Sequence, residues 1–414
     1  MKIEILCTGD EVLSGKIINS NYSFMSSKLE EVGLNVIWGT TVGDNKEDLL
    51  RAFDLASERA DAVIVNGGLG PTVDDLSQEV AAIASGNELE LRTDWLEIME
   101  KFFIKRGRVM TENNKKQAML PKTSELINNP IGTACGFAVN IKKARFFFTP
   151  GVPRELFLML ENEIIPRLLS MSGENIVTKL KTFHSYGIGE SRADSLLKDV
   201  VELAPNKNVK LGFQAHFPQL ETKLFIRASS ADEIEKNLIP VENEVRKILG
   251  NYIFTEDKDT LEDSIIRALS KSNQTLSIAE FLTQGNVSSR LAGADKNGEN
   301  LKFSVNSNNI KTLTKNLEID NDLEKSLILN EKIAENCRLK YSTDMSLSVL
   351  INYLDNNEAD TYISLSLDGK LISRTGKFIG DEYRVTLGSA EMALDCLRRY
   401  LSNLPFDEKS DFER

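Results

Sequence analysis

The sequence predicts an α/β protein whose first part is a parallel β-sheet covered by helices on both faces. Three observations over the first 160 residues support this prediction. Short apolar runs alternate with segments in which apolar residues recur every three or four positions, the connections are short, and several apolar runs end at glycines. This alternation is typical of sheets whose parallel strands are joined by crossover helices.

The expected elements of this first part follow from hydrophobic periodicity and from helix stop signals. Gly33 follows a helical stripe that includes Leu29, so we expect that helix to end there. A wholly apolar run of Ala, Val and Ile breaks at Gly67 and predicts a buried strand. In chain order, we predict strands at 3–7, 35–42, 62–65 and 145–149, and helices over 24–32, 49–56, 76–85 and from 154 onward.

The two regions after the first part have a different order of strand-like and helical segments. Residues 175–255 alternate strand-like and helical segments and predict a small α+β unit. The region from 256 begins with a helix and ends with a strand pair followed by another helix. The charged last residues, 407–414, are expected to fray. We therefore expect three domains, at 1–170, 171–255 and 256–414.

Composition excludes several classes of function. The chain has 414 residues and a formal charge of −12, from 50 Lys and Arg against 62 Asp and Glu. This acidic balance argues against nucleic-acid or anionic-membrane binding, because both partners need a basic surface. With His184 and His216 as its two histidines, the chain cannot build a multi-histidine metal centre. It shows no secretory signal pattern and no apolar stretch of about 18 residues, so we expect a cytoplasmic protein.

The segment Val-Asn-Gly-Gly-Leu-Gly-Pro-Thr-Val-Asp-Asp carries the strongest local signal. Backbone N–H groups at Gly67, Gly68 and Gly70 are open to a ligand ahead of a helix N-terminus, where an anion is favoured. Asp74 and Asp75 would repel that anion unless a cation lay between them, so the segment predicts a metal-bridged phosphate site. The alternative is a tight strand–helix turn in which Asp75 is the N-cap of the following helix.

Three other loops carry acidic residues at the ends of predicted elements. Asp10 and Glu11 stand between two glycines after the first strand, and Asp44 follows the second strand. Glu155 ends the segment Pro-Gly-Val-Pro-Arg-Glu, which leads from a strand into a helix. Ordinary turns are the alternative, with Asp44 or Asn45 as a helix cap. Because open α/β sheets bind ligands at the carboxyl ends of their strands, the four loops predict one site.

These motifs, together with Asn-Lys-Lys-Gln-Ala at 114–118 and Asn-Pro-Ile-Gly-Thr-Ala at 129–134, resemble those of the CinA family (competence/damage-inducible protein A). The resemblance covers essentially the whole chain and implies a first domain of the MogA/MoeA molybdopterin-binding type, a three-layer α/β fold. It also implies an ADP-ribose pyrophosphatase that depends on a divalent metal cation, with potassium in some members. The segment 185–191 resembles the start of the family's KH-like domain but lacks a basic Gly-x-x-Gly loop, so RNA is not an expected partner.

The resemblance and the loop chemistry together select the site residues. Asp44 and Asp75 are the expected catalytic and metal-binding residues, and Asp74 is the next catalytic candidate. A bound metal would neutralise the pyrophosphate and acidify an attacking water, which gives AMP and ribose 5-phosphate. Two of the substrate-binding residues, Thr133 and Gly151, come from the resemblance alone. The predicted substrate-binding residues are Asp10, Glu11, Gly67, Gly68, Gly70, Pro71, Thr72, Asn114, Thr133, Gly151 and Glu155.

The third region resembles, in outline, the family's nicotinamide mononucleotide amidase domain of the PncC type. The family's Glu-Ser-Cys-Thr-Gly-Gly motif reads Glu-Phe-Leu-Thr-Gln-Gly from Glu280, and residues 295–300, where the nucleophilic serine should stand, contain no serine. Lys311 remains from a Tyr-Ser-Asn-x-x-Lys motif that has lost its tyrosine. Because a nucleophile that is absent cannot be activated, we expect the amidase activity to be lost.

Other functions are compatible with these patterns. A molybdopterin- or nucleotide-binding protein of the molybdenum-cofactor type would keep the fold without pyrophosphatase activity. A nicotinamide-nucleotide amidase, or a non-enzymatic scaffold linked to competence, would act through the later regions. For the leading interpretation, the expected partners are a nucleotide substrate and a second copy of the chain, since the resemblance implies a homodimer.

Overall fold

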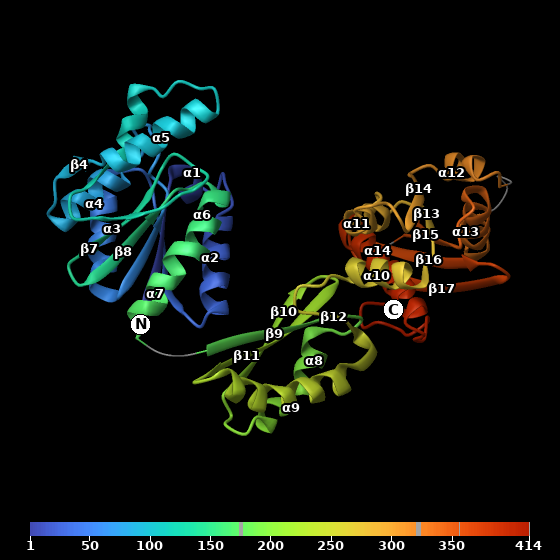
Figure 1. Cartoon of the computed structure of the whole chain (residues 1–414). Helices are drawn as coiled ribbons and strands as arrows, with labels where there is room; N and C mark the ends of the chain where they lie inside the picture. Colours follow the sequence, from blue (N-terminus) through green and yellow to red (C-terminus); the bar gives the residue numbers. More distant parts are fainter. Residues whose placement is uncertain (174–176, 320–323, 356, 414) are drawn as a thin grey trace. The chain divides into compact units, whose positions relative to one another are not determined.

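The structure, a computed structural model, describes residues 1–173, 177–319, 324–355 and 357–413 (Figure 1). The chain packs into two compact units, Met1–Lys179 with Arg227–Ser230 and Leu180–Ile226 with Ala231–Arg414. Each unit has its own hydrophobic cores. The domain limits at 170 and 255 stay predictions.

The first unit is built on a six-stranded sheet whose strands are β1 (Ile3–Thr8), β2 (Val36–Val42), β3 (Ala62–Asn66), β6 (Glu125–Ile127), β7 (Gly136–Ile141) and β8 (Ala144–Thr149). The strand order is β2-β1-β3-β8-β7-β6. β1, β2, β3 and β8 pair in parallel, which confirms the predicted parallel sheet for these strands. β7 runs antiparallel to β8 and to β6, an edge that the sequence pattern did not predict.

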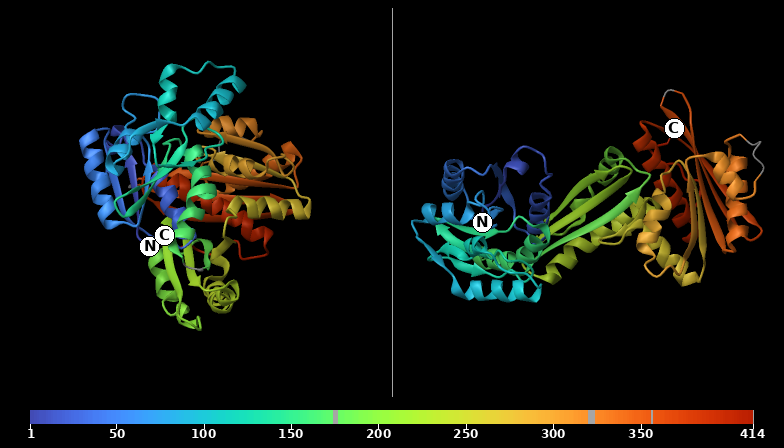
Figure 2. Two further views of the ribbon diagram at one scale, coloured as in Figure 1. Left: turned by 60° about the vertical axis from the view of Figure 1, so that its left-hand side comes forward. Right: turned by 90° about the horizontal axis from the view of Figure 1, so that it is seen from above.

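Helices cover both faces of this sheet (Figure 2). They are α2 (Ser20–Glu31), α3 (Lys46–Arg59), α4 (Ser77–Ser85), α5 (Thr93–Lys105), α6 (Pro153–Met159) and α7 (Ile165–Ser172). The single-turn helix α1 (Asp10–Leu13) follows β1 and buries none of its residues. Successive residues of β3 point to opposite faces. Val63 and Val65 join the core under α3, α4 and α5, whereas Ala62 and Ile64 join the core under α2, α6 and α7. The expected three-layer fold is confirmed.

Short elements complete the first unit. The antiparallel pair β4 and β5 stands apart from the main sheet. α6 continues through a π-helical turn, η2, directly into α7. These elements are β4 (Leu89–Leu91), β5 (Met119–Pro121), the 3₁₀ helix η1 (Glu112–Ala118) and η2 (Leu160–Ile164).

The second unit begins with a four-stranded antiparallel sheet of order β10-β11-β9-β12. α9 buries Leu238, Val241 and Val245 as one apolar stripe. The predicted small α+β arrangement is confirmed, and β12 pairs with β9 at the edge of this sheet. The elements are β9 (Val177–Tyr186), α8 (Glu190–Leu197), η3 (Val200–Leu203), β10 (Val209–His216), β11 (Gln219–Ala228), α9 (Ala231–Leu249), η4 (Gly250–Tyr252) and β12 (Ile253–Glu256).

The rest of the second unit is a five-stranded mixed sheet of order β14-β13-β15-β16-β17 between two helix layers. α10, α11 and α14 cover one face, and α12 and α13 cover the other. The expected α/β fold of this region is confirmed. The elements are α10 (Leu261–Ser272), β13 (Leu276–Phe281), α11 (Asn286–Ala294), β14 (Leu301–Ser307), α12 (Ile310–Asn316), α13 (Leu327–Tyr341), β15 (Met345–Tyr353), β16 (Glu358–Leu367), β17 (Lys370–Ile379) and α14 (Glu382–Leu401).

The C-terminal tail, which we expected to fray, is packed in its described residues up to 413. Arg374 of β17 donates to both carboxylate oxygens of Glu413 at 2.6 and 2.7 Å, and the two side chains are only 5% and 3% exposed. The Asp411 carboxylate accepts from Gly189 N at 2.9 Å and from Arg192 at 2.7 Å. The expectation was wrong because the buried Arg374 requires a counter-charge, which the tail supplies.

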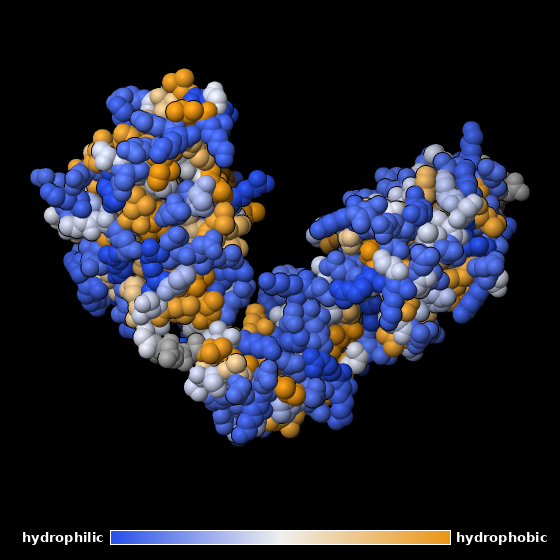
Figure 3. All heavy atoms as spheres, viewed as in Figure 1, coloured by the Kyte–Doolittle hydropathy of each residue, from blue (hydrophilic) through white to orange (hydrophobic). Residues whose placement is uncertain are grey.

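Within the described ranges, none of the helices combines the length and the apolarity needed to cross a bilayer. On the face drawn in Figure 3, hydrophilic residues cover most of the second unit. Apolar atoms are visible at the end of the first unit that carries α5, where Ile104 is 75% exposed.

Candidate functional site

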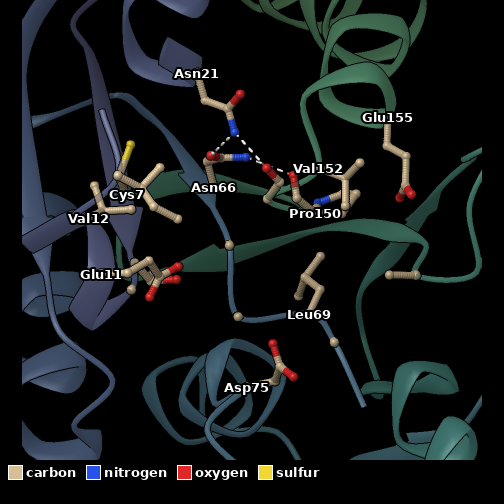
Figure 4. A pocket seen from close by; sticks show the side chains of 18 of the residues that line it. Cys7, Glu11, Val12, Asn21, Asn66, Leu69, Asp75, Pro150, Val152 and Glu155 are labelled. Carbon is tan, nitrogen blue, oxygen red and sulfur yellow. Dashed lines mark hydrogen bonds between the residues drawn. The ribbon is translucent and has the colours of Figure 1, made fainter. Parts of the chain in front are cut away.

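A cavity of about 750 Å³ lies in the first unit at the carboxyl ends of its parallel strands (Figure 4). Its walls come from the loops after β1, β2, β3 and β8, the segment that leads into α2, the end of η1 and the segment before β7. The four loops selected from the sequence therefore meet at one edge of the sheet, as parallel pairing requires. The volume is in the range of pockets that hold small ligands and cofactors.

The backbone of the glycine-rich loop after β3 adopts a conformation that leaves no room for side chains at Gly67 and Gly68. Gly67 and Gly68 have φ angles of 111° and 69°, in the left-handed region that favours glycine. A Cβ atom on Gly67 would lie 2.6 Å from the hydroxyl oxygen of Thr8. Ser77, the first residue of α4, holds the loop by donating from its hydroxyl to Gly67 O at 2.9 Å and from its N–H to Gly68 O at 3.1 Å.

Asp75 lines the cavity and is not the N-cap of α4. The helix begins at Ser77, and its N-cap position is held by Leu76 without a side-chain hydrogen bond. Asp75 Oδ2 instead accepts from Thr72 N at 2.8 Å and from Thr72 Oγ1 at 2.6 Å. The capping alternative for Asp75 is thus corrected: the carboxylate folds back on its own loop. Lys116 approaches the same loop and donates to Thr72 O.

In the loop after β2, two neighbouring residues have different roles. Asn45 is the N-cap of α3 and accepts from the N–H groups of Glu47 and Asp48 at 3.0 and 3.1 Å. Asp44 lines the cavity, and its Oδ2 accepts from Asp10 N at 3.1 Å, while Asp44 N donates to Asp10 Oδ1 at 3.2 Å. The cap is therefore Asn45, and the Asp44 carboxylate remains at the cavity.

Asp44 stands among like charges. Burial raises the pKa of its carboxyl group, and the negative charges of Asp10, Glu11 and Asp74 raise that pKa further, against the lowering effect of the Asp10 N–H. Such crowding is relieved when a cation binds. Over the described residues, no group of three or more His, Cys, Asp or Glu side chains is arranged to hold a metal ion by itself.

Glu155 forms the opposite wall of the cavity, in the first turn of α6 (Figure 4). Pro153 is the first residue of this helix, where its missing N–H leaves no helical hydrogen bond unmade. The Glu155 carboxylate accepts from Asn129 Nδ2 at 2.8 Å. Burial raises the pKa of Glu155, since the hydrogen bond from Asn129 and the charge of Arg106 offset only part of the lost solvation.

Most of the predicted site residues line the cavity, and two do not. The lining includes Glu11, Asp44, Gly67, Gly68, Gly70, Pro71, Thr72, Asp74, Asp75, Thr133, Gly151 and Glu155. Asp10 stands behind Asp44 and is absent from the lining. Asn114 is also absent, because its amide oxygen accepts from Thr111 N at 3.0 Å and Thr111 Oγ1 at 2.9 Å in a capping box.

Four buried polar residues of the wall were not selected from the sequence, namely Thr8, Asn21, Asn66 and Gln117. Asn66 ends the apolar strand β3, and a polar residue at the end of a buried run is a signal that could have found it. Gln117 stands inside a motif that carried the resemblance. Asn21 gave no local signal, because its partners are distant in the chain.

The region expected to hold the amidase nucleophile is a turn built around a carboxylate. Asp295 is buried and accepts from the N–H groups of Glu299, Asn300 and Leu301 at 3.1, 2.9 and 2.7 Å. Glu280 is also buried and accepts from two backbone N–H groups of the first turn of α11. Both carboxylates are engaged in holding backbone N–H groups in place.

The fold and the cavity define an α/β protein with a molybdopterin-binding type of first domain. Residues 4–170 match the family model described as a probable molybdopterin binding domain, and residues 180–255 match that of the damage-inducible protein CinA KH domain. A CinA-like protein of Shewanella sp. (strain MR-4) is 36% identical over 353 residues, which cover 84% of this chain and 82% of that protein. A CinA-like protein of Shewanella woodyi is 42% identical over 292 residues, 70% and 67% of the two chains. The chain belongs to the CinA-like protein family.

Solved structures with detectable likeness include the protein CinA with unknown function from Thermoplasma acidophilum. It is 32% identical, and the match covers 40% of this chain and 96% of that chain with a TM-score of 0.37. The molybdopterin biosynthesis enzyme MoaB from Thermus thermophilus matches at 17% identity over 41% of this chain and 94% of that chain, with a TM-score of 0.29.

Proposed function

We propose that the first domain hydrolyses the pyrophosphate bond of a nucleotide diphosphate-sugar, ADP-ribose, to AMP and ribose 5-phosphate. The observation that carries this proposal is the shared cavity: a glycine-rich loop, suited to phosphate, and the carboxylates Asp44, Asp75 and Glu155 line the same space. Phosphate-binding amides beside acidic residues are the arrangement of cation-assisted phosphoryl chemistry.

The glycine-rich loop would bind the phosphate groups. Gly67 and Gly68 give this loop its shape, because both have positive φ angles and a Cβ atom at either position would collide with Thr8 or Ser77. The Gly67 N–H is not available, because it donates to Thr149 O at 3.0 Å, so this predicted phosphate contact is corrected. The backbone N–H groups of Gly68 and Gly70 would be the donors for the phosphate oxygens. Asp75 keeps the loop in shape through its two hydrogen bonds with Thr72.

Asp44 and Asp75 would hold a divalent cation, with potassium as a second candidate cation. Two protein carboxylates suffice for Mg²⁺, which usually completes its shell with water and substrate phosphates. The crowding of Asp44 by Asp10, Glu11 and Asp74 fits a cation at this place. When bound, the cation neutralises the pyrophosphate and acidifies water.

Glu155 is suited to hold a proton near the substrate. Its raised pKa keeps more of the carboxyl group neutral at a given pH than an exposed glutamate would show. A neutral carboxyl group beside the phosphates repels them less than a carboxylate and can donate its proton to a departing phosphate oxygen.

The test is AMP release from ADP-ribose by the full chain, after chelation and then with a panel of divalent cations. Asp44→Asn is compared with Asp48→Asn, a carboxylate of α3 whose side chain is 61% exposed and which does not line the cavity. We expect cation-dependent release that falls at least about 100-fold, or about 2.7 kcal/mol, in Asp44→Asn and is unchanged in the control. No release with any cation, or an Asp44→Asn variant as active as the wild type, would overturn the proposal.

A second candidate is binding of a pterin phosphate without hydrolysis, which the family-model match over residues 4–170 supports. Both candidates use the same cavity, so they are separated by function. Tight molybdopterin binding without ADP-ribose turnover favours the second, and turnover that molybdopterin does not inhibit favours the first.

A further inference from the structure

Three polar side chains in the cavity wall are buried and carry an oxygen without a hydrogen-bond partner within the part of the chain that the structure describes. They are Thr8, Asn21 and Gln117, which are 7%, 9% and 5% exposed, and the atoms are Oγ1, Oδ1 and Oε1. A buried polar atom left unpaired costs about 1–3 kcal/mol. Their position around one cavity points to a ligand that supplies the missing partners.

The hydrogen bonds of Asn21 fix which atom of its amide group is unpaired. Nδ2 donates to Asn66 Oδ1 at 2.9 Å and to Gly151 O at 2.8 Å. Asn66 cannot flip, because its own Nδ2 donates to Pro150 O at 2.8 Å and to Thr149 Oγ1 at 3.1 Å. A flipped Asn21 would turn its oxygen toward two acceptors. Figure 4 shows the nitrogen of Asn21 turned toward Asn66 and the oxygen turned away.

The hydrogen-bonding character of the unpaired atoms determines which ligand groups can bind them. Amide oxygens accept hydrogen bonds and cannot donate them, so Asn21 Oδ1 and Gln117 Oε1 both require a donor. An ionised phosphate has no N–H or O–H to offer. A hydroxyl group or an exocyclic amine does, and neither brings a charge into the buried wall. Thr8 Oγ1 can serve as donor or acceptor.

We propose that Asn21 and Gln117 are specificity-determining residues that recognise the uncharged hydrogen-bond donors of the nucleotide, its sugar hydroxyls or the exocyclic amine of its base. This inference rests on the proposed function and deepens it. Both residues are held beside the glycine-rich loop, since Gln117 Nε2 donates to Leu69 O at 3.4 Å and Asn21 Nδ2 donates to Asn66 Oδ1 at 2.9 Å. The Asn21–Asn66 hydrogen bond sets the orientation of this part of the cavity wall before any ligand arrives.

The test is equilibrium binding to the full chain by calorimetry, which does not depend on turnover. The probes are AMP, 2′,3′-dideoxy-AMP and purine riboside 5′-monophosphate, which lacks the exocyclic amine. We expect one of the two analogues to bind the wild type at least about 10-fold more weakly than AMP, as the loss of a buried hydrogen bond implies. A weaker dideoxy analogue identifies the sugar hydroxyls, and a weaker purine riboside identifies the amine.

The variants Asn21→Ala and Gln117→Leu locate the acceptor. In the variant that lacks it, AMP and the weak analogue should bind equally, because the lost partner no longer distinguishes them. Asn140→Ala is the matched control, an exposed asparagine of β7 outside the lining, and it should keep the wild-type ratio. If Asn21→Ala does not fold, because it unpairs Asn66 and Gly151, the wild-type comparison of the three probes decides.

Two results would overturn the inference while the proposed function stands. One is tight AMP binding by the wild type with both analogues bound equally well. The other is an analogue penalty that persists unchanged in Asn21→Ala and in Gln117→Leu. Absence of AMP binding together with absence of ADP-ribose hydrolysis would instead contradict the proposed function, and the inference with it.

Discussion

Asp44 and Glu155 both have pKa values raised by burial, but their surroundings differ. Asp44 faces other carboxylates, whose charges add to the effect of burial. Glu155 accepts a hydrogen bond from Asn129, which lowers its pKa and offsets part of the effect of burial. The surroundings of Asp44, unlike those of Glu155, become more favourable when a cation binds. The two groups are therefore suited to different tasks, cation binding for Asp44 and proton holding for Glu155.

The raised pKa of Glu155 predicts a pH effect on stability. The native state keeps this proton at pH values where the unfolded chain has lost it, so the free energy of unfolding falls as pH rises from the ordinary pKa of glutamate through the higher native pKa. Glu155→Gln removes this slope and keeps an oxygen that can accept from Asn129. Urea unfolding of both proteins between about pH 4 and 8 measures it. Curves that stay parallel over the whole range would contradict the prediction.

Single residues of the site could be predicted when their role is local. Asp44 and Asp75 were selected because each follows a strand, and both line the cavity. The choice of cap between Asp44 and Asn45 could not be predicted, because both residue types cap helices well. It depends on Asp10, which is 34 residues away in the chain and occupies the Asp44 carboxylate. Non-local contacts of this kind have no signal in a local pattern.

Among the elements, the loops of the cavity were predictable and the C-terminal tail was not. Each cavity loop follows a short apolar strand, and parallel pairing then brings the loops together without further information. The tail is charged and short, which is typical of a frayed end. Its order comes from Arg374, in a strand well before it in the chain. The tail is ordered because of its contact with Arg374, which the sequence of the tail alone does not reveal.

The pair of Arg374 and Glu413 predicts a measurable contribution to stability. Glu413→Gln keeps the size of the side chain and leaves the buried guanidinium without a counter-charge. We expect a loss of about 3–5 kcal/mol in the unfolding of the second unit, the usual result of breaking a buried ion pair. Urea denaturation measures it, with Asp407→Asn, an exposed position of the same tail, as control. Equal midpoints for Glu413→Gln and wild type would show that the pair is not stabilising.

At the scale of the whole molecule, we predict that two chains assemble into a homodimer. The family resemblance implies a homodimer, and two-fold dimers are the commonest soluble assemblies. We expect light scattering to give about twice the 46.3 kDa mass of one chain at micromolar concentration. A mass that stays at that of one chain on concentration would contradict it.

The second unit is expected not to release ammonia from nicotinamide mononucleotide. The α/β fold expected for its C-terminal region is present, but the turn where the nucleophile should stand is organised by Asp295, which accepts from three backbone N–H groups. Ser307 donates its hydroxyl hydrogen to the backbone oxygen of Asn309 at 2.9 Å, and a peptide oxygen is not a base that can activate a nucleophile. An ammonia assay of the full chain should stay at background. Metal-independent release that disappears in Ser307→Ala would show that a nucleophile remains.

Cation-dependent AMP release from ADP-ribose, measured for the wild type and for Asp75→Asn, tests directly whether the cavity hydrolyses this substrate. The amide keeps an oxygen that can accept from both donors of Thr72, so the loop and the melting temperature should be nearly unchanged. We expect AMP and ribose 5-phosphate in equal amounts from the wild type and at least about a 100-fold loss of AMP release in the variant. A folded Asp75→Asn protein that releases AMP as fast as the wild type, or a wild type that releases none with any divalent cation, would contradict it.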